Sequence, residues 1–274
     1  IDGTEFKAKP ENATLILDAL KRIAIRQDLD EPAINTALNY LAVRHKKVEY
    51  FLNDETTPIK SWYIGNSTAD HQGTFMLLQN ETQKSSIPFI VHKPGMRGYL
   101  DARFFTSFND WRYTGIYNYG IGAIKNIQFI NHDEPFESFS ITVDKDSKVN
   151  FLDENQAPLP LFDTLQLSHY VTHFKKLHFS HTVTDLTEKQ IDSVLTLPPN
   201  VSIEVTDNTD SKKKVNIWKI FDNIETDEGT WIKKLNPGYA FLSINGSKEL
   251  VRVQYHQWDN VLKPKHYFLP KKIK

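Results

Sequence analysis

Apolar positions in the first third of the chain follow two different periods. Over residues 12–26 and 31–45 they recur every three or four residues, which predicts two amphipathic helices. These positions are Leu15, Ile16, Ala19, Leu20, Ile23, Ile34, Ala37, Leu38 and Leu41. Asp30 is a candidate N-cap for the second helix, with Pro32 in the first turn. Four runs rich in β-branched and aromatic residues follow, at residues 48–52, 60–64, 73–78 and 88–92, and predict two hairpins.

The same order of elements returns in the second half. Asp163 is a candidate N-cap for a helix whose apolar positions are Leu167, Val171, Phe174 and Leu177. Thr187 and Gln190 have the Thr-x-x-Gln spacing of a capping box at the start of another helix. Strand-like runs follow at residues 201–205, 215–220, 238–244 and 249–255. The dipeptide Asn245-Gly246 between the last two is a favoured hairpin turn.

Corresponding positions of the two halves keep their order at a rising offset. The pairs are Leu17 and Val171 (171 − 17 = 154), Asp30 and Thr187 (187 − 30 = 157), Val48 and Ile203 (203 − 48 = 155), Trp62 and Trp218 (218 − 62 = 156), and Gly73 and Gly238 (238 − 73 = 165). Loop insertions would produce such a drift, which favours a duplication over chance recurrence. We therefore expect an α+β fold of two tandem related units, over residues 1–115 and 116–274. Each would be a mainly antiparallel sheet with two helices packed on one face.

The second half carries three more strand-like runs ahead of its first helix, at residues 124–130, 138–143 and 148–152. The first half has only the short run at residues 1–6. This mismatch predicts about 30 further residues of strands upstream of Ile1 in the natural protein, with a membrane anchor or a signal ahead of them.

The composition narrows the function classes. The chain has 33 Lys and Arg against 34 Asp and Glu, which argues against a nucleic-acid binder that depends on phosphate contacts. With 39% hydrophobic and 24% charged residues, its 274 residues suffice for two globular cores. Cysteine is absent, so disulfides, thiolate metal sites and cysteine nucleophiles are excluded. No apolar run approaches the roughly 20 residues of a membrane helix.

Motifs for catalysis and metal binding are weak. His169 and His173 are four residues apart on a predicted helix, but no His-Glu-x-x-His and no acid in the same helical register accompany them. There is no Gly-x-Ser-x-Gly, and the Gly-Ile-Gly at residues 120–122 lacks the rest of a phosphate-binding loop. The acidic pairs at residues 133–134 and 227–228 are predicted to be solvated loops. We expect no catalytic residue, no metal and no cofactor; a hydrolase with an unrecognised site is the remaining alternative.

The segment over residues 92–112 interleaves arginines with large aromatic residues. That composition suits a contact surface, because Arg and Trp supply bidentate donors and large desolvated area. The other interpretation is that Tyr99, Phe104, Phe105 and Trp111 pack the join of the two units while the arginines pair locally. The candidate binding residues are Arg97, Tyr99, Arg103, Trp111, Arg112 and, from an earlier strand, Trp62.

Several motifs resemble one family. They are Trp62-Tyr63-Ile64-Gly65, Thr68-Ala69-Asp70, Gly73-Thr74-Phe75-Met76, Pro88-Phe89-Ile90-Val91-His92, Gly95-Met96-Arg97-Gly98-Tyr99-Leu100, Arg103-Phe104, Asp110-Trp111-Arg112, Ser138-Phe139 and Val251-Arg252-Val253-Gln254-Tyr255. Together they resemble the domain-of-unknown-function 4340 family in its Bacteroidetes-type form, over most of the chain. The resemblance implies a bacterial cell-envelope protein with an N-terminal membrane helix or lipid anchor, sometimes encoded beside ABC-type export and gliding-associated components. The family has no established catalytic residues.

From these observations we expect a non-enzymatic, extracytoplasmic accessory or interaction subunit on the periplasmic side. It would be membrane-anchored in an envelope complex such as an ABC-type transporter, with the segment from Arg97 to Arg112 as its contact surface. The alternative is a glycan- or lipid-binding module that uses the cleft between the two repeats, with Trp62, Tyr63 and Trp111 as stacking platforms. Neither hypothesis involves a nucleic acid.

Overall fold

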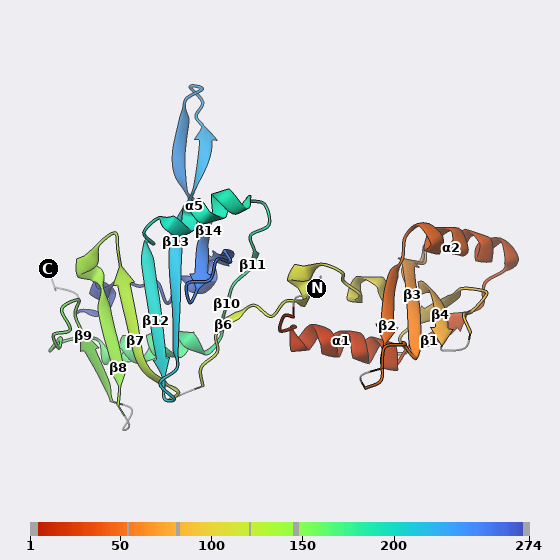
Figure 1. The fold of residues 1–274 in the computed structure, drawn as a ribbon, viewed down its shortest axis with the longest axis horizontal. Coiled ribbons are helices and arrows are strands. Elements are labelled where there is room, and N and C mark those ends of the chain that lie inside the picture. The colour runs from red at the N-terminus through yellow and green to blue at the C-terminus, as the bar shows by residue number, and fades with distance from the viewer. Residues whose placement is uncertain (1–4, 54, 81–82, 121, 145–147, 271–274) are drawn as a thin grey trace. The chain divides into compact units, whose positions relative to one another are not determined.

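The protein has an α+β fold made of two compact units, residues 1–113 and 114–274 (Figure 1). The computed structural model describes residues 5–53, 55–80, 83–120, 122–144 and 148–270. Residues 1–4 of the strand-like run at the start of the chain lie outside this range. Every strand pair among the described residues is antiparallel, which confirms the expected sheet type.

Unit 1 is a five-stranded sheet in the order β1-β5-β4-β3-β2. Its elements are α1 (Pro10–Lys21), β1 (Ala24–Gln27), α2 (Glu31–Val43), β2 (Lys46–Tyr50), β3 (Lys60–Ser67), β4 (Thr74–Asn80), β5 (Phe89–His92), the 3₁₀ helix η1 (Asp101–Arg103) and α3 (Phe108–Trp111). The predicted cap of α2 is confirmed, since the Asp30 carboxylate accepts a 3.0 Å hydrogen bond from the Ala33 amide. The first helix ends at Lys21, earlier than predicted, and the next residues form the edge strand β1.

The two long helices of unit 1, α1 and α2, lie on opposite faces of the sheet, so the expectation that both pack on one face is wrong. Ile16 of α1 packs in a cluster with Ile64 and Met76. On the other face α2 comes so close to β3 that a Cβ at Gly65 would lie 2.8 Å from the Leu41 side chain. Successive strand residues point to opposite faces, and both faces of this sheet carry apolar residues, so each face needs a covering helix.

The segment after β5 closes the α1 face of unit 1. Leu100 and Phe104 are almost completely buried in the cluster beneath α1. The Leu100 amide also donates a 2.8 Å hydrogen bond to the buried hydroxyl of Thr74 on β4. The aromatic residues of residues 92–112 therefore contribute to the core of unit 1.

Unit 2 has an eight-stranded sheet in the order β11-β15-β14-β13-β12-β7-β8-β9 and a separate pair, β10-β6. Its elements are β6 (Gly115–Tyr117), β7 (Ile124–Asn131), η2 (Pro135–Glu137), β8 (Phe139–Val143), β9 (Val149–Leu152), α4 (Thr164–Thr172), η3 (His173–Lys175), β10 (Leu177–His178), β11 (His181–Thr182), α5 (Glu188–Thr196), β12 (Val201–Asp207), β13 (Lys212–Glu225), β14 (Trp231–Ile244), β15 (Val251–Gln254), α6 (Tyr255–Trp258) and η4 (Lys265–Phe268). The Asp163 cap and the Thr187–Gln190 capping box are confirmed. Asn245 and Gly246 form the predicted turn, with φ of 51° and 71°.

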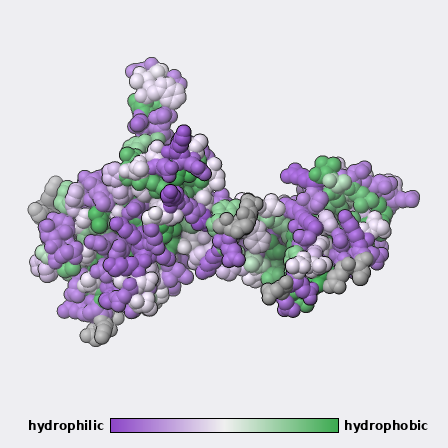
Figure 2. Space-filling model, in the orientation of Figure 1, coloured by the Kyte–Doolittle hydropathy of each residue, from purple (hydrophilic) through white to green (hydrophobic). Residues whose placement is uncertain are grey.

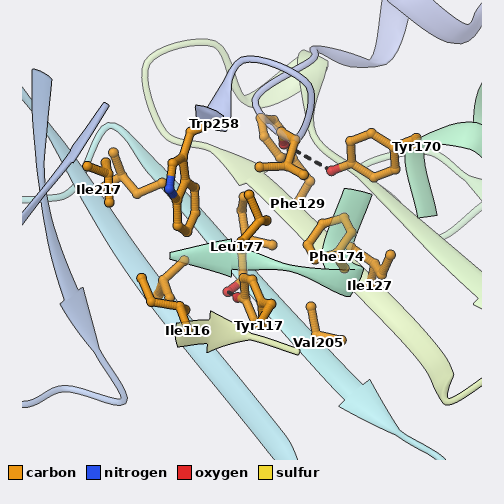
Figure 3. Packing of buried hydrophobic residues seen from close by; sticks show 14 of the residues in the cluster. Ile116, Tyr117, Ile127, Phe129, Tyr170, Phe174, Leu177, Val205, Ile217 and Trp258 are labelled. Atoms are coloured by element: carbon orange, nitrogen blue, oxygen red, sulfur yellow. Dashed lines mark hydrogen bonds between the residues drawn. The ribbon is translucent and has the colours of Figure 1, made fainter. Parts of the chain in front are cut away.

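The two longer helices of unit 2, α4 and α5, also lie on opposite faces of its sheet. On the α4 side, a large aromatic core includes Tyr117, Phe174 and Trp258 (Figure 3). The indole N–H of Trp258 donates a 2.9 Å hydrogen bond to the His178 carbonyl. On the α5 side, Trp218 packs with apolar residues of that helix. Trp62 instead belongs to the α1 side of its sheet, so the expected correspondence of Trp62 and Trp218 is wrong.

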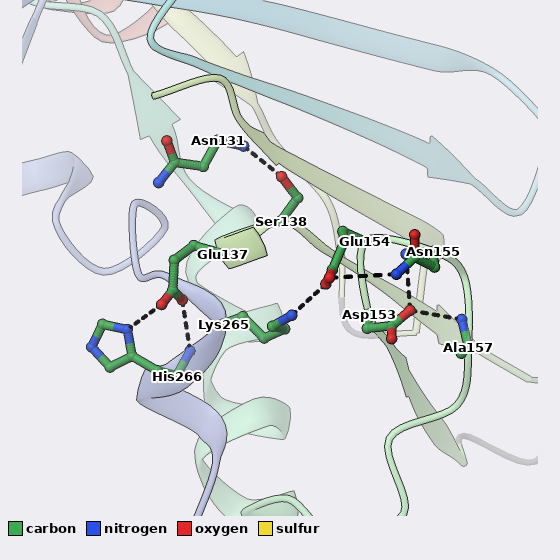
Figure 4. Close-up of polar contacts among 9 residues, drawn as sticks. All are labelled: Asn131, Glu137, Ser138, Asp153, Glu154, Asn155, Ala157, Lys265 and His266. Carbon is green, nitrogen blue, oxygen red and sulfur yellow. Dashed lines mark hydrogen bonds and ion pairs between the residues drawn. The ribbon is translucent and has the colours of Figure 1, made fainter. Parts of the chain in front are cut away.

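The C-terminal segment of unit 2 is held against the sheet by polar contacts (Figure 4). The carboxylate of Glu137, only 7% exposed, accepts hydrogen bonds from the backbone amide and the Nδ1 atom of His266, both at 3.0 Å. Next to it, Lys265 forms an ion pair with Glu154. These contacts satisfy a carboxylate that would otherwise be costly to bury.

No helix among the described residues is long and apolar enough to cross a membrane.

Candidate interaction surfaces

Three of the six candidate binding residues pack within unit 1. The indole N–H of Trp111 donates a 2.9 Å hydrogen bond to the Phe105 carbonyl, and the two rings meet edge to face at 5.5 Å. The guanidinium of Arg112 lies over the Phe6 ring, 5.4 Å from its centroid. Trp62 lines a different pocket from Trp111 and Arg112. Trp111 therefore packs inside unit 1, whereas the packing interpretation had placed it at the join of the two units.

The other three candidates do not complete a shared surface. Arg103 donates to the sulfur of Met96 at 3.0 Å. Tyr99 is 39% exposed and its ring lies 5.7 Å from that of His71. Arg97 is exposed and forms no ion pair with any residue that the structure describes. Among the six, Arg97 and Tyr99 are therefore the ones open to solvent contact.

The proposed stacking residues do not share a face either. Trp62 and Tyr63 are neighbours on β3 and point to opposite sides of the sheet. Tyr63 faces α2, where its ring lies 5.3 Å from that of His45 and 4.2 Å from the Nζ of Lys84. One ligand cannot stack on both rings at once.

The sequence-based prediction missed a projecting hairpin that exposes five large apolar side chains. Strands β13 and β14 are each 14 residues long and extend beyond the sheet as a projecting hairpin (Figure 1). We call residues 221–235 the β-arm. It begins at a bulge, where the register shifts after Lys219 and the side-chain oxygen of Asn236 accepts hydrogen bonds from the amides of Gly238 and Tyr239. The bulge bends the ladder at the point where the arm leaves the sheet.

Large apolar side chains occupy both faces of the β-arm. Their exposed fractions are 54% for Phe221, 39% for Ile224, 65% for Trp231, 46% for Ile232 and 43% for Leu235. Phe221 lies opposite Leu235, and Ile224 opposite Ile232. Figure 2 shows part of the arm as hydrophobic below its tip. Cross-strand pairing leaves these side chains exposed to solvent, and packing against the described part of unit 2 does not bury them.

The sequence indicated the turn of the β-arm but not its strands. Acidic residues 227–228 were assigned to a solvated loop, and they do lie in its turn, where Gly229 has a φ of 73°. The strand residues on either side of this turn alternate between apolar and polar only imperfectly, because neither face of the arm is buried. Alternation of apolar and polar residues identifies strands that have one buried face, so it does not identify a hairpin that is exposed on both faces.

The histidines and carboxylates are the candidate metal ligands of the chain, since it has no cysteine. No group of three or more His, Asp or Glu side chains in the described ranges is arranged to hold a metal ion. His169 and His173 lie with ring centroids 4.6 Å apart, and burial together with the neighbouring His169 lowers the pKa of His173. The arrangement offers a pair of imidazoles at the surface of α4 without a third ligand.

Comparison of the chain with protein-family models, with curated proteins and with solved structures found no match. The functional proposals below therefore depend on the surfaces of this chain and on the family resemblance of its motifs.

Proposed function

We propose that the protein is a non-catalytic interaction subunit and that the β-arm is its contact surface. The observation that carries the proposal is the exposure of five large apolar side chains on one projecting hairpin. Soluble surfaces rarely gather such residues without a partner, and Trp is among the residues that contribute most to association. Loss of one central aromatic anchor commonly weakens binding by about 2 kcal/mol, or roughly 30-fold in Kd.

The setting follows from the resemblance to the domain-of-unknown-function 4340 family. It supports a membrane-anchored, extracytoplasmic accessory subunit of a bacterial envelope complex, with ABC-type transporter subunits as the partners. A hairpin that projects from a globular unit suits this role, because it reaches a partner without rearrangement of the core.

We also infer that the two units are related by duplication. The order helix, strand, helix and four strands is shared, except that unit 2 has η3 and β10 in addition between α4 and β11. The sheet order is shared too: β1-β5-β4-β3-β2 in unit 1 and β11-β15-β14-β13-β12 in unit 2. The two sheets can be aligned strand by strand with the row Ile64, Met76 and Phe89 across β3 to β5 on the row Ile217, Leu242 and Val251 across β13 to β15. This alignment makes Val215, rather than Trp218, the counterpart of Trp62.

The interaction role is tested by affinity purification of the tagged protein from native membranes in mild detergent, followed by mass spectrometry. A Trp231→Ser, Ile232→Ser variant should lose the co-purifying subunits while its melting temperature stays unchanged, because both side chains are exposed. Leu165→Ser is the matched control, since Leu165 is 83% exposed on α4 of the same unit. An Arg97→Ala variant tests the surface predicted from the sequence.

Equal recovery of partners by the wild type and the arm variant would refute the β-arm as the contact surface. Loss of partners only in Arg97→Ala would return the contact to the segment of residues 92–112. A protein that purifies alone from every preparation would remove the subunit role itself.

A further inference from the structure

Part of the α1 face of unit 1 is not covered. A groove of about 380 Å³ runs along it, between the end of α1 and strands β3 to β5. Its lining includes Leu20, Ile23, Lys60, Trp62, Leu78 and Phe89. Leu78 is 38% exposed, and Trp62 and Phe89 are only partly buried. The groove is therefore an apolar sheet surface with a lysine at its rim.

The corresponding surface of unit 2 is covered by β6. Val215 and Ile203, the counterparts of Trp62 and Val48, are completely buried there. Tyr117 of β6 packs in this core and is completely buried (Figure 3). Its hydroxyl donates a 2.9 Å hydrogen bond to the Ile203 carbonyl. One extended segment thus turns the open sheet surface into a core.

A lysine at the rim is shared by the two units. In unit 2 the ammonium of Lys213 donates a 2.8 Å hydrogen bond to the backbone carbonyl of Ile116 on β6. Lys60 has the same register position in unit 1, because it lies opposite Tyr50 of β2 as Lys213 lies opposite Val205 of β12. Lys60 is exposed at the rim of the groove. Its ammonium is placed to bind the backbone of an extended segment in the same way.

Strand β2, next to β3 in the sheet of unit 1, also lacks a partner that its counterpart in unit 2 has. In unit 2, β12 pairs with β13 on one side and with β7 on the other. In unit 1, its counterpart β2 pairs with β3 alone among the described residues. An unpaired edge is a template for a further strand.

We propose that the sheet of unit 1 binds a segment of the same polypeptide that lies N-terminal to residue 1 and is built like residues 115–152. One extended stretch of it places an aromatic side chain in the groove, and the following strand pairs antiparallel with β2. The proposal rests on the inferred relation of the two units and goes beyond the role of the β-arm. Tyr117 precedes the first residue of α4 by 47 positions (164 − 117), which puts the aromatic residue roughly 40 positions before residue 1.

The test compares the 274-residue chain with a polypeptide that carries the 60 or so natural residues encoded ahead of it. Hydrogen exchange followed by mass spectrometry should show amides of residues 46–50 slowed by about tenfold or more in the longer protein. The ¹⁹F resonance of 5-fluorotryptophan at Trp62, assigned with a Trp62→Phe variant, should lose its response to a soluble paramagnetic quencher. Leu78→Glu in the longer protein should restore that response, and Leu165→Glu in unit 2 should not.

Unchanged exchange in β2 and an accessible Trp62 in the longer protein would overturn the proposal. So would a gene that encodes fewer than about 40 residues ahead of Ile1. Protection of β2 that depends on protein concentration would assign the edge to a second copy of the chain, and would overturn it too. Purification of the β-arm variant gives an independent result, so failure here is distinguishable from failure of the proposed function.

Discussion

Tyr117 provides a direct test of how β6 holds unit 2 together. Its ring lies 5.3 Å from Phe174 and 6.3 Å from Trp258, and its hydroxyl is bonded to the Ile203 carbonyl. Burial raises the pKa of the hydroxyl well above its ordinary value, so the group stays protonated and remains a donor. Two substitutions separate the hydrogen bond from the packing: Tyr117→Phe removes only the hydroxyl, and Tyr117→Ala removes the ring as well.

The expected costs follow from burial. Loss of one neutral buried hydrogen bond costs about 1 kcal/mol. Removal of a completely buried aromatic ring costs about 4 kcal/mol, because the ring fills space that the surrounding core cannot fully reclaim. Unit 2 spans 161 residues (274 − 113), and for that size 1 kcal/mol corresponds to roughly 3 °C in Tm. We expect Tm to fall by about 3 °C in Tyr117→Phe and about 12 °C in Tyr117→Ala.

Differential scanning calorimetry measures both values, with urea unfolding as a second estimate of the free energy. Tyr267→Phe is the control, because that side chain is 47% exposed in the same unit and its hydroxyl loss should leave Tm unchanged. If Tyr117→Ala cost no more than Tyr117→Phe, the ring would not fill a packed core. The covering of the unit 2 sheet by β6 would then no longer support the segment proposed to bind unit 1.

Two further outcomes are expected. Gly65→Ala should destabilise the protein by about 2 kcal/mol, measured by urea unfolding, because the added Cβ would lie 2.8 Å from the buried Leu41 side chain. Gly120→Ala is the control and should be neutral, because a Cβ at Gly120 has no atom within 4 Å. Equal effects of the two substitutions would disprove the close approach of α2 to β3. Burial, followed by the charge of Lys214, lowers the pKa of His132, so the unfolded chain takes up this proton at a higher pH than the folded one and stability falls as the pH drops below about 6.5. In His132→Gln, Tm should decline less between pH 7 and pH 5 than in the wild type, and parallel pH profiles would contradict this account.

Local features were predictable from the sequence because they depend on neighbouring residues. Asp30, Asp163 and Thr187 cap the helices that were assigned to them, since a cap needs only a short polar side chain and the next three amides. The α+β class and the antiparallel pairing followed from the order of helical and alternating segments. Asn245-Gly246 identified its turn because both residues must adopt a positive φ.

The candidate contact residues were harder to place. A stretch rich in arginine and aromatic residues has the same composition in a core as in an interface, and only the fold shows that Trp111 packs against Phe105 and leaves Arg97 in solvent. The β-arm was missed for the opposite reason, because its apolar residues do not follow the pattern of a buried face.

Sequence alone thus determined the capped helices, one hairpin turn and the order of most elements along the chain, all of which arise from interactions over a few residues. Tertiary structure decided which face of a sheet each helix covers, which strands lie side by side and which apolar side chains remain exposed to solvent. These depend on contacts between residues far apart in the chain: Tyr117 reaches Ile203 across 86 positions, and Lys213 reaches Ile116 across 97. No local period encodes such a pairing, because it is selected by the burial that the whole sheet makes possible.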